Sequence, residues 1–374
     1  MIIGGFLLQK SQLESILRYM LQIKENILLA PFTTLGIGGR ARYFAEAKAM
    51  DEMVQALRFA GEKRLPVHIM GRGSNVLVSD DGFDGLVLLN RISGIKHAKD
   101  GDKAIIVAGA GEDWQNLVDF AVANGFAGVE TLSGIPGSVG GAPIQNIGAY
   151  GQEASHVIKE VIVYDTERGK VVRLGRAECD FGYRKSIFNA KHPGRYVVLE
   201  VIFELKAGGE PTLLYQDLKL HFANKPKPGL EDVHLAVLEI RAKKGMVIHP
   251  DFESYKSAGS FFKNPVVSKD IFDKAKDAIG EGNGKWFWPQ ADGKIKVSAA
   301  KLIESSGFPK GFKFGNAGIS PKHSLSLINL GGAKASEIIE LAKKIFSGVK
   351  DKFGISIEPE VQLVGFKESP FKQI

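Results

Sequence analysis

A glycine-rich stretch in the middle of the chain constrains its fold more than any other feature. Between Gly134 and Gly151, six of the 18 residues are glycine. The others are mainly Ile, Val, Ala, Pro and Tyr, whereas a flexible surface loop is usually filled with charged residues and serine. Glycine lets backbone amides crowd around an anion because no Cβ intervenes. Long ordered loops are uncommon and often functional, so we expect a buried loop that binds a flat, partly apolar ligand.

A second glycine turn has the sequence GRGSN and runs from Gly71 to Asn75 after a strand-like run. The dinucleotide fingerprint of a doubly wound fold requires a helix to open at this point. The next residues are Val-Leu-Val-Ser, which favour a strand, so the pattern predicts strand, turn and strand. Two interpretations stay open: a plain hairpin turn, or a turn whose bare amides, with Ser74 and Asn75, surround a diphosphate.

The composition is close to that of an ordinary soluble globular protein. The 374 residues predict two or three domains, and 44% hydrophobic with 24% charged residues is typical of soluble proteins. The 49 Lys and Arg exceed the 42 Asp and Glu by seven and are scattered. That pattern indicates a solvated basic surface, or one that steers anionic small molecules. The sequence contains no basic stripe with interleaved aromatic residues, so a nucleic-acid partner is not expected.

Cysteine, histidine and the first residues of the chain argue against several other classes. Cys179 is the one cysteine, which excludes an intrachain disulfide and fits a reducing compartment. The eight histidines are dispersed without metal-binding spacing, so we expect no metal site. The apolar start is short, without a basic region or cleavage site. We therefore expect a cytoplasmic protein with no membrane partner.

Hydrophobic periodicity gives a coarse map of the elements. It predicts helices over 50–62, 113–125 and 336–354, and a helical extension from residue 1 to about 28. It predicts strands over 66–71, 76–80, 85–90, 104–111, 156–165, 170–174, 195–205 and 355–365. The composition shifts near residue 210, which we expect to be the main domain boundary. We therefore expect an extension over 1–30, a first domain over 31–208, a second domain over 209–366 and a tail over 367–374. The last strand of the second domain is expected to pack back on the first domain.

Three short segments place reactive side chains next to apolar ones. Arg184 in FGYRKSIF is either a surface arginine on a turn or a fork for a carboxylate or phosphate. Ser260 in GSFFKNP either caps a phenylalanine pair in the core or donates a proton in a dry pocket. In IEPEV, Pro359 fixes the local direction, so that Glu358 and Glu360 point to one side of an extended segment. Each segment taken alone leaves both interpretations open.

Six motifs in this order resemble the MurB family, the UDP-N-acetylenolpyruvoylglucosamine reductases. The resemblance runs from Pro31 to Gly365 and rests on TTLGIGGRARYF, GRGSNVLVSD, GIPGSVGGAPIQNIGAYG, FGYRKSIF, SAGSFFKNP and IEPEVQLVG. It implies an α+β protein, with an FAD-binding domain of the vanillyl-alcohol-oxidase (PCMH) type followed by a C-terminal substrate-binding domain. It also implies a flavoenzyme that holds FAD non-covalently and takes electrons from NADPH. The implied reaction reduces UDP-N-acetylglucosamine-enolpyruvate to UDP-N-acetylmuramate for peptidoglycan.

The resemblance assigns roles to individual residues. Arg184 and Glu360 stabilise an enolic intermediate, and Ser260 donates the proton. The residues assigned to FAD are Gly71, Arg72, Gly73, Ser74, Asn75, Pro136, Gly137, Ser138, Gly140, Gly141, Asn146 and Gly148. The residues assigned to the substrate are Tyr215, which matches the extra tyrosine of one subgroup, Lys244 with Lys243 as its rival, Asn264 and His323.

Two other functions would use the same glycine loops. Another FAD oxidoreductase of this fold, such as an alcohol oxidase, would have no reason to combine Ser260, Glu360 and Arg184. A non-catalytic nucleotide-sugar binder would need the diphosphate loops but no flavin. In each case we expect small-molecule ligands, and a monomer or weak oligomer.

Overall fold

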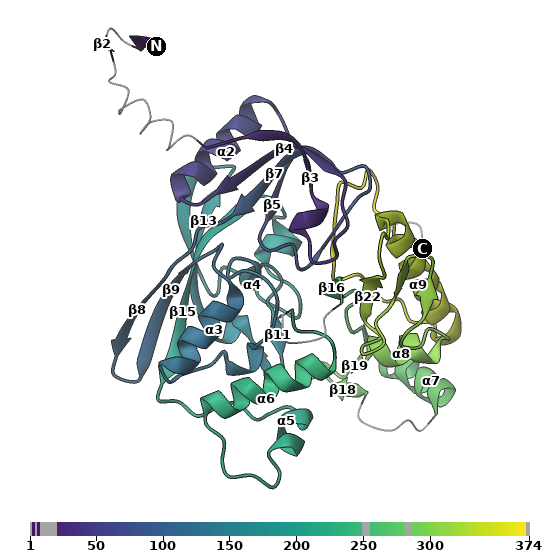
Figure 1. Cartoon of the computed structure of the whole chain (residues 1–374). Coiled ribbons are helices and arrows are strands. Elements are labelled where there is room, and N and C mark those ends of the chain that lie inside the picture. The colour runs from purple at the N-terminus through teal and green to yellow at the C-terminus, as the bar shows by residue number, and fades with distance from the viewer. Residues whose placement is uncertain (1, 4–5, 8–20, 249–254, 281–285, 372–374) are drawn as a thin grey trace.

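The computed structural model describes residues 2–3, 6–7, 21–248, 255–280 and 286–371 (Figure 1). The helical pattern over 13–20 lies outside these residues. The prediction of a helix over the rest of the N-terminal extension is wrong where the structure describes it. β1 (Ile2–Ile3) pairs with β2 (Phe6–Leu7), and residues 24–28 form the strand β3 (Lys24–Leu28). β3 pairs antiparallel with β4 (Arg40–Ala47), and this ladder of backbone hydrogen bonds holds residues 24–28 as a strand.

The first sheet has the strand order β3-β4-β7-β5 and supports the glycine turn at residue 71. β7 (Phe83–Asn90) lies parallel to β4 and to β5 (Val67–Met70). Helix α2 (Met50–Glu62) covers one face and buries Met53, Ala56 and Ala60 there. These elements agree with the periodicity, because their buried faces follow the helical and strand repeats.

The second sheet is antiparallel and carries the order β14-β13-β15-β9-β8. The strands are β8 (Ile95–Asp100), β9 (Lys103–Gly109), β13 (Ile158–Asp165), β14 (Lys170–Gly175) and β15 (Tyr196–Ala207), with β10 (Phe126–Ala127) paired to β15. Helix α3 (Trp114–Ala123) packs its apolar face into this core, where Cys179 is also buried. Burial raises the pKa of the Cys179 thiol to about 12, so we assign it to packing.

Two helices that the sequence analysis missed follow the second sheet. They are α5 (Gln216–His221) and α6 (Leu230–Lys243), and they lie along the lower edge of the molecule in Figure 1. The inner face of α6 includes the polar residues His234 and Arg241, so its apolar repeat is incomplete. That broken pattern explains why periodicity alone did not reveal the helix.

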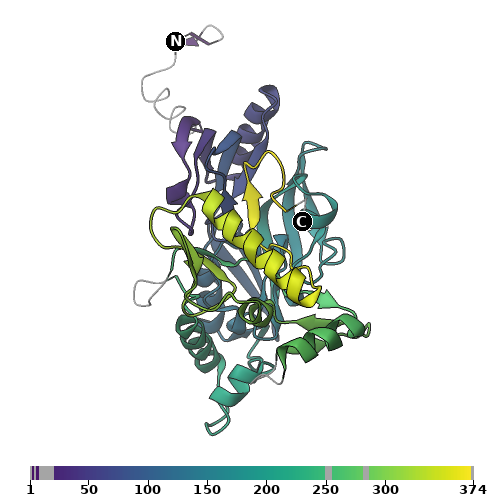
Figure 2. The same ribbon diagram turned by 90° about the vertical axis from the view of Figure 1, so that its right-hand side faces the viewer.

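Where the structure describes it, the C-terminal part forms two small sheets and three helices. β16 (Ser257–Ser260), β22 (Ser326–Asn329), β21 (Ala317–Ile319) and β20 (Lys313–Phe314) make one sheet, and β17 (Val266–Val267), β19 (Ile295–Val297) and β18 (Phe287–Pro289) make the other. The helices are α7 (Lys269–Ile279), α8 (Ala299–Ser305) and α9 (Ala335–Phe353). Figure 2 shows α9 running diagonally across this region, and its inner face includes Ile338, Leu341 and Ile345.

The end of the chain returns to the first domain. β23 (Gln362–Val364) pairs in parallel with β6 (Val76–Val78), although the sequence predicts a longer strand over 355–365. The Asp80 carboxylate accepts hydrogen bonds from the backbone N–H groups of Ala335 (2.6 Å) and Ser336 (3.0 Å) at the start of α9. Both contacts fix the C-terminal part against the glycine turn, while the expected domain limits stay a prediction.

Candidate functional site

One cavity of about 730 Å³ contains most of the residues that the sequence singled out. Its volume is in the range of pockets that hold small molecules and cofactors, about 300–1,000 Å³. Two glycine segments, the end of β16 and the extended segment before β23 meet around it. The expected site residues that line it are Gly71, Arg72, Gly73, Ser74, Asn75, Pro136, Gly137, Ser138, Gly140, Gly141, Gly148, Arg184, Ser260 and Glu360.

The turn from Gly71 to Asn75 is not a hairpin, because its two flanking strands belong to different sheets. β5 pairs with β7, whereas β6 pairs with β23. Within the described part of the chain, the backbone N–H groups of residues 72–75 donate no hydrogen bond. Arg72 forms an ion pair with Asp113, the N-cap residue of α3. Consecutive free amides of this kind form a concave anion site.

The second glycine segment lies against the first. Ser74 Oγ donates a hydrogen bond to the carbonyl oxygen of Pro136 at 2.8 Å. Gly137 has φ +149°, and a Cβ there would come 3.2 Å from Ser74 Oγ. A Cβ on Gly71 would collide with Ser138 Oγ. The bare backbone therefore leaves a cradle that side chains would fill, and this fits the diphosphate of a dinucleotide.

The loop over 134–151 is buried or half-buried, apart from Gly141 and Gly151, which are exposed. It is not purely irregular, since it contains the short helix α4 (Gly141–Ile144) and β11 (Gly148–Ala149), which pairs with β12 (Gln152–Glu153). Asn146 lies outside the lining of the cavity. Its side-chain amide donates to Glu153 Oε2 and its amide oxygen accepts from Ser155 N–H, so that it holds the loop.

Arg184 is fixed by three acceptors. Its Nε donates to Glu360 Oε1 at 2.8 Å, its Nη2 to the carbonyl oxygen of Gly148 at 3.0 Å, and its Nη1 to that of Asn146 at 3.3 Å. Its backbone has φ +53°, and Asn146 (+44°) and Tyr150 (+47°) share this uncommon conformation. Strained backbone gathers at sites that hold a ligand or a reacting group.

Glu360 and Ser260 come from adjacent extended segments. Glu360 N–H donates to the carbonyl oxygen of Phe261 at 2.8 Å, and Lys263 N–H donates to that of Glu358 at 2.9 Å. Phe261 is buried, and its ring centroid lies 5.1 Å from that of Phe262. Burial raises the pKa of the Glu360 carboxyl, although Arg184 acts in the opposite direction. The two phenylalanines thus anchor the segment that presents Ser260.

Two of the expected substrate residues lie together outside the lining of this cavity. The ring of Tyr215 packs edge-on against Tyr150 with centroids 5.2 Å apart. Lys244 Nζ lies 5.5 Å from the centroid of Tyr150 and 2.9 Å from Asp217 Oδ2. Lys243 is exposed and pairs instead with Glu239 on the surface of α6. The geometry therefore favours Lys244 over Lys243 as the residue near Tyr215.

The other two expected substrate residues also lie outside the lining. Asn264 Oδ1 accepts the backbone N–H of Ala299 at 3.0 Å, at the start of α8. His323 Nδ1 accepts the backbone N–H of Leu325 at 3.2 Å. Burial, together with the nearby cations Lys244, Lys310 and Arg241, lowers the pKa of His323 to about 4. His323 is therefore neutral at neutral pH.

Several cavity residues escaped the sequence analysis. They include His68, Gln145, Tyr164, Tyr196 and Arg241. Gln145 Oε1 accepts a hydrogen bond from Asn75 Nδ2 at 2.7 Å, and the same amide reaches the carbonyl oxygen of Glu360 at 3.2 Å. Gln145 falls within the glycine motif, whereas Arg241 stands among the charged residues Glu239, Lys243 and Lys244, which gave no local signal. The glycine motif was therefore the one sequence signal that could have indicated Gln145.

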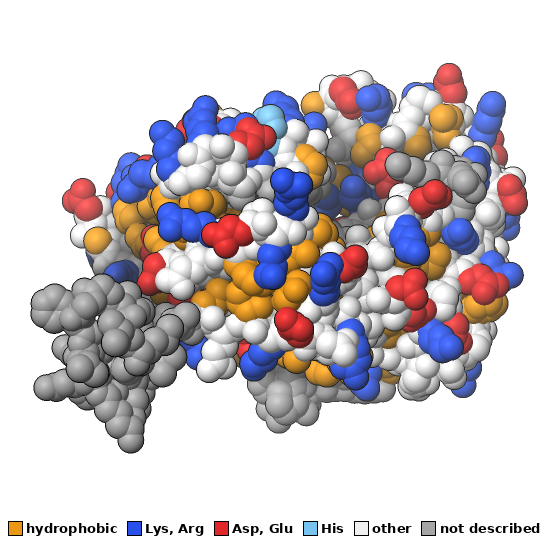
Figure 3. Space-filling model, turned by 90° about the horizontal axis from the view of Figure 1, so that it is seen from above, with side chains coloured by type: hydrophobic (Ala, Val, Ile, Leu, Met, Phe, Trp, Pro, Cys, Tyr) orange, Lys and Arg blue, Asp and Glu red, His pale blue; other side chains and the backbone are white. Residues whose placement is uncertain are grey.

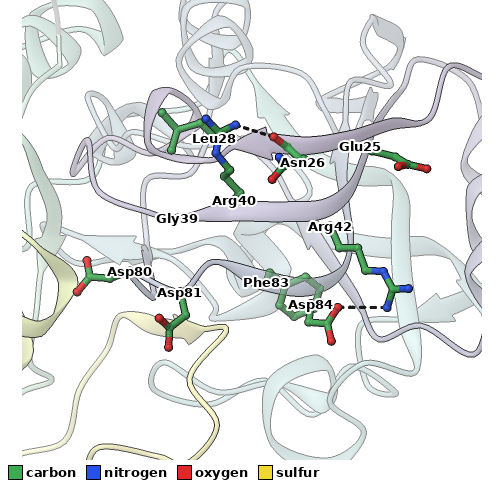
Figure 4. A pocket seen from close by; sticks show the side chains of 10 residues that line it. All are labelled: Glu25, Asn26, Leu28, Gly39, Arg40, Arg42, Asp80, Asp81, Phe83 and Asp84. Carbon is green, nitrogen blue, oxygen red and sulfur yellow. Dashed lines mark hydrogen bonds and ion pairs between the residues drawn. The ribbon is translucent and has the colours of Figure 1, made fainter.

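A second hollow lies over β3, β4 and β7, and Figure 4 shows its ten lining side chains. Here Arg42 pairs with Asp84 at 3.3 Å, and Arg40 donates to the carbonyl oxygen of Asn26 at 2.7 Å. It contains none of the expected site residues. The face seen in Figure 3 carries Lys and Arg intermixed with Asp and Glu, without a basic stripe. The chemistry is therefore assigned to the first cavity.

Neither a metal centre nor a membrane-spanning helix is found where the structure describes the chain. No group of three or more His, Cys, Asp or Glu side chains there has the arrangement to hold a metal ion. Among the described helices, none combines the length and apolarity needed to cross a bilayer.

Known families and proteins match nearly the whole chain. Residues 41–175 match the FAD binding domain family, and residues 250–364 match the C-terminal domain of UDP-N-acetylenolpyruvoylglucosamine reductase. The UDP-N-acetylenolpyruvoylglucosamine reductase of Thermobifida fusca is 41% identical over 348 residues, which cover 91% of this chain and 97% of that protein. The reductase of the same name from Pseudomonas putida is 37% identical, with 91% and 99% covered.

A solved structure shares the fold. The crystal structure of UDP-N-acetylenolpyruvylglucosamine reductase (MurB) from Thermus caldophilus superposes with a TM-score of 0.62 and 28% identity, over 92% of this chain and 100% of that one. The domain matches confirm the expected α+β architecture, an FAD-binding domain followed by a C-terminal reductase domain.

Proposed function

Because this chain belongs to the MurB family of UDP-N-acetylenolpyruvoylglucosamine reductases, we propose that it reduces UDP-N-acetylglucosamine-enolpyruvate to UDP-N-acetylmuramate with NADPH. The observation that carries the proposal is the convergence of Arg184, Glu360 and Ser260 on the cavity that both glycine segments line. The product is a precursor of peptidoglycan, so the protein acts in cell-wall synthesis.

The chain is a flavoprotein, and the cradle supports non-covalent binding of FAD. The free amides of residues 72–75 suit its diphosphate, with Pro136 to Gly141 closing the other side. Bound FAD would supply the redox chemistry, the transfer of a hydride from NADPH to the substrate double bond. The residues of this chain then have to hold the substrate in register, stabilise the developing charge and deliver a proton.

Charge develops on the substrate carboxylate as the double bond is reduced, and the geometry suits its stabilisation. The guanidinium of Arg184 is held in place by Glu360 and two carbonyl oxygens before any ligand arrives. A donor that is already oriented costs no reorganisation during the reaction. Burial raises the pKa of the Glu360 carboxyl while Arg184 lowers it, and the Glu360 carboxylate holds the guanidinium in its position by accepting from Arg184 Nε.

Ser260 is the proposed proton donor. A serine hydroxyl is a weak acid, so it requires a strongly basic acceptor such as an enolate carbon. Ser260 lines the cavity on β16, next to the buried Phe261 and close in sequence to the Lys263 ammonium. Lys263 itself lies 3.5 Å from Glu358 and lowers the pKa of Glu360 through space.

The remaining substrate contacts follow from the cluster at the end of α6. Lys244 provides a cation for the substrate diphosphate, and Tyr215 is the proposed lid residue above it. Asn264 and His323 stay candidates for polar contacts with the sugar nucleotide. We also propose that the protein works in the cytoplasm as a monomer or weak oligomer.

The decisive assay follows NADPH oxidation by the flavin-loaded protein with and without UDP-N-acetylglucosamine-enolpyruvate. We expect a rate that depends on this substrate and a product with the mass of UDP-N-acetylmuramate. A flavin-loaded sample that shows no substrate-dependent rate would overturn the proposal. A colourless protein that binds UDP-sugars would favour the non-catalytic binder, and oxidation of alcohols with O₂ would favour an oxidase of this fold.

A further inference from the structure

Arg241 is a buried arginine in the wall of the cavity. It lies in the last turn of α6, lines the cavity and is 8% exposed. Its Nη2 donates to the carbonyl oxygen of Met246 at 3.1 Å. Its Nε is buried and has no hydrogen-bond partner, and no carboxylate of the described chain forms an ion pair with it.

A guanidinium in this state is costly for a protein. A buried charge without a countercharge loses its hydration, and proteins normally pair it or neutralise it. Arginine keeps its proton under nearly all conditions, so it does not escape the cost by titration. Burial lowers the pKa of Arg241, which reflects the same cost. Binding of an anion in the cavity removes the penalty.

The other arginines of the cavity are compensated or solvated. Arg184 is paired with Glu360, so this pair adds no net charge. Arg72 is paired with Asp113, and Arg58 is exposed to solvent. Among the arginines that line the described cavity, Arg241 is therefore the buried one without a countercharge.

The surroundings of Arg241 concentrate positive charge. Lys244 follows one turn later on α6, and His323 experiences the charges of both residues. Gly134 lies against the guanidinium, because a Cβ on Gly134 would come 3.2 Å from Arg241 Nε. Its φ of +70° also favours glycine. The first glycine of the loop thus leaves room for the arginine side chain.

We propose that Arg241 binds an oxyanion of the substrate, either the enolpyruvyl carboxylate or a phosphate of the diphosphate. This inference rests on the proposed function, and it adds a binding residue to the set that the motifs indicated. A guanidinium fork matches the geometry of both oxyanions. The compensation of Arg184 by Glu360 favours the carboxylate, which otherwise lacks a net positive partner.

The test uses flavin-loaded protein with Arg241→Gln and Arg241→Lys, and Lys243→Gln as the matched control. Lys243 is an exposed cation two residues away on the same helix, so its variant removes the same charge from the surface. Titration with UDP-N-acetylglucosamine-enolpyruvate, followed by the flavin spectrum, gives Kd, and steady-state assays give KM. We expect R241Q to raise both about 10- to 100-fold, because hydrogen bonds to charged groups contribute that much. R241K should retain part of the affinity, and K243Q should resemble wild type.

UDP-N-acetylglucosamine has the diphosphate but no carboxylate, so it distinguishes binding of the carboxylate from binding of the diphosphate. A loss of affinity for the enolpyruvyl ligand alone assigns Arg241 to the carboxylate, and an equal loss for both assigns it to the diphosphate. Unchanged Kd values for both ligands in R241Q would overturn the proposal, as would a loss of bound FAD with ligand affinity intact. If R241Q does not fold, R241K decides by the same comparison. Wild-type protein that binds these ligands without reducing the substrate would disprove the reductase function and leave this comparison valid.

Discussion

Arg184 Nε lies 2.8 Å from Oε1 of Glu360, although 176 positions separate the two residues in the chain. Arg184 stands in a turn with φ +53°, and Glu360 precedes β23, which pairs with the strand after the first glycine turn. The ion pair therefore connects the first domain with the end of the chain. It also orients a guanidinium before a substrate binds, which is the condition for electrostatic stabilisation of an enolate.

Replacing Glu360 by Gln tests this pair. We expect E360Q to lower kcat about 10²- to 10³-fold, the usual effect of losing one preorganised group at a developing oxyanion. NADPH should still bleach the flavin at a rate close to wild type, because that step does not involve the substrate. Stopped-flow absorbance separates the two half-reactions. Glu358→Gln is the control, since Glu358 is exposed two residues away, and an equal loss in both variants would contradict the assignment.

Ser260→Ala tests the proton donor. Flavin reduction by NADPH should stay within about twofold of wild type, while reoxidation by the substrate should fall about 10²- to 10⁴-fold. Single-turnover mixing of reduced enzyme with substrate measures the second rate. Ser268 is an exposed serine before α7 and serves as the control in S268A. Normal reoxidation in S260A would remove Ser260 from the mechanism.

Gly71→Ala tests the cradle. The added methyl group meets Ser138 Oγ, so the two glycine segments have to separate and the FAD affinity should decrease at least about tenfold. The ratio of flavin absorbance to protein after dialysis reports the loss. Gly175, at the end of β14 and outside the lining, provides the control variant G175A. Full flavin content in G71A would show that the turn does not contact the cofactor.

His68 makes stability depend on pH. Burial lowers its pKa from 6.5 to about 4, so it is neutral in the folded protein while the unfolded chain takes up a proton below about pH 6.5. The neutral His68 therefore contributes about 3 kcal/mol to the free energy of unfolding above about pH 6.5, and this contribution is lost as the pH falls towards 4. We expect His68→Leu to reduce the drop in Tm between about pH 7.5 and 5. The exposed His192 is the control, and H192L should keep the wild-type drop.

Asp80 is expected to stabilise the contact between the two parts of the chain. Its carboxylate accepts from two N–H groups at the start of α9 and from Ser336 Oγ at 2.9 Å. Loss of such a cap costs about 1–2 kcal/mol, so D80A should lower Tm by several degrees. The adjacent Asp81 is exposed, and D81A serves as the control in the same calorimetric scan. Equal Tm values for D80A and wild type would contradict this role.

Much of the fold was accessible from local patterns. The helices α2, α3 and α9 and the strands β5, β7, β9, β13, β14 and β15 follow clear repeats, and the structure confirms them. β3 and α6 were missed because their form depends on contacts with other elements. β3 is held by its ladder with β4, and α6 buries polar side chains that break its repeat.

The sequence by itself determined the two glycine segments, the phenylalanine pair beside Ser260 and the order of motifs that indicates the family. These are local properties, because backbone freedom and residue type at a fixed spacing can be read along the chain. Only the tertiary structure decided that Arg184 is compensated by Glu360 while Arg241 is buried in the same cavity without a countercharge. The charge balance of a site depends on distant segments that meet in space, and no local pattern records which of them meet.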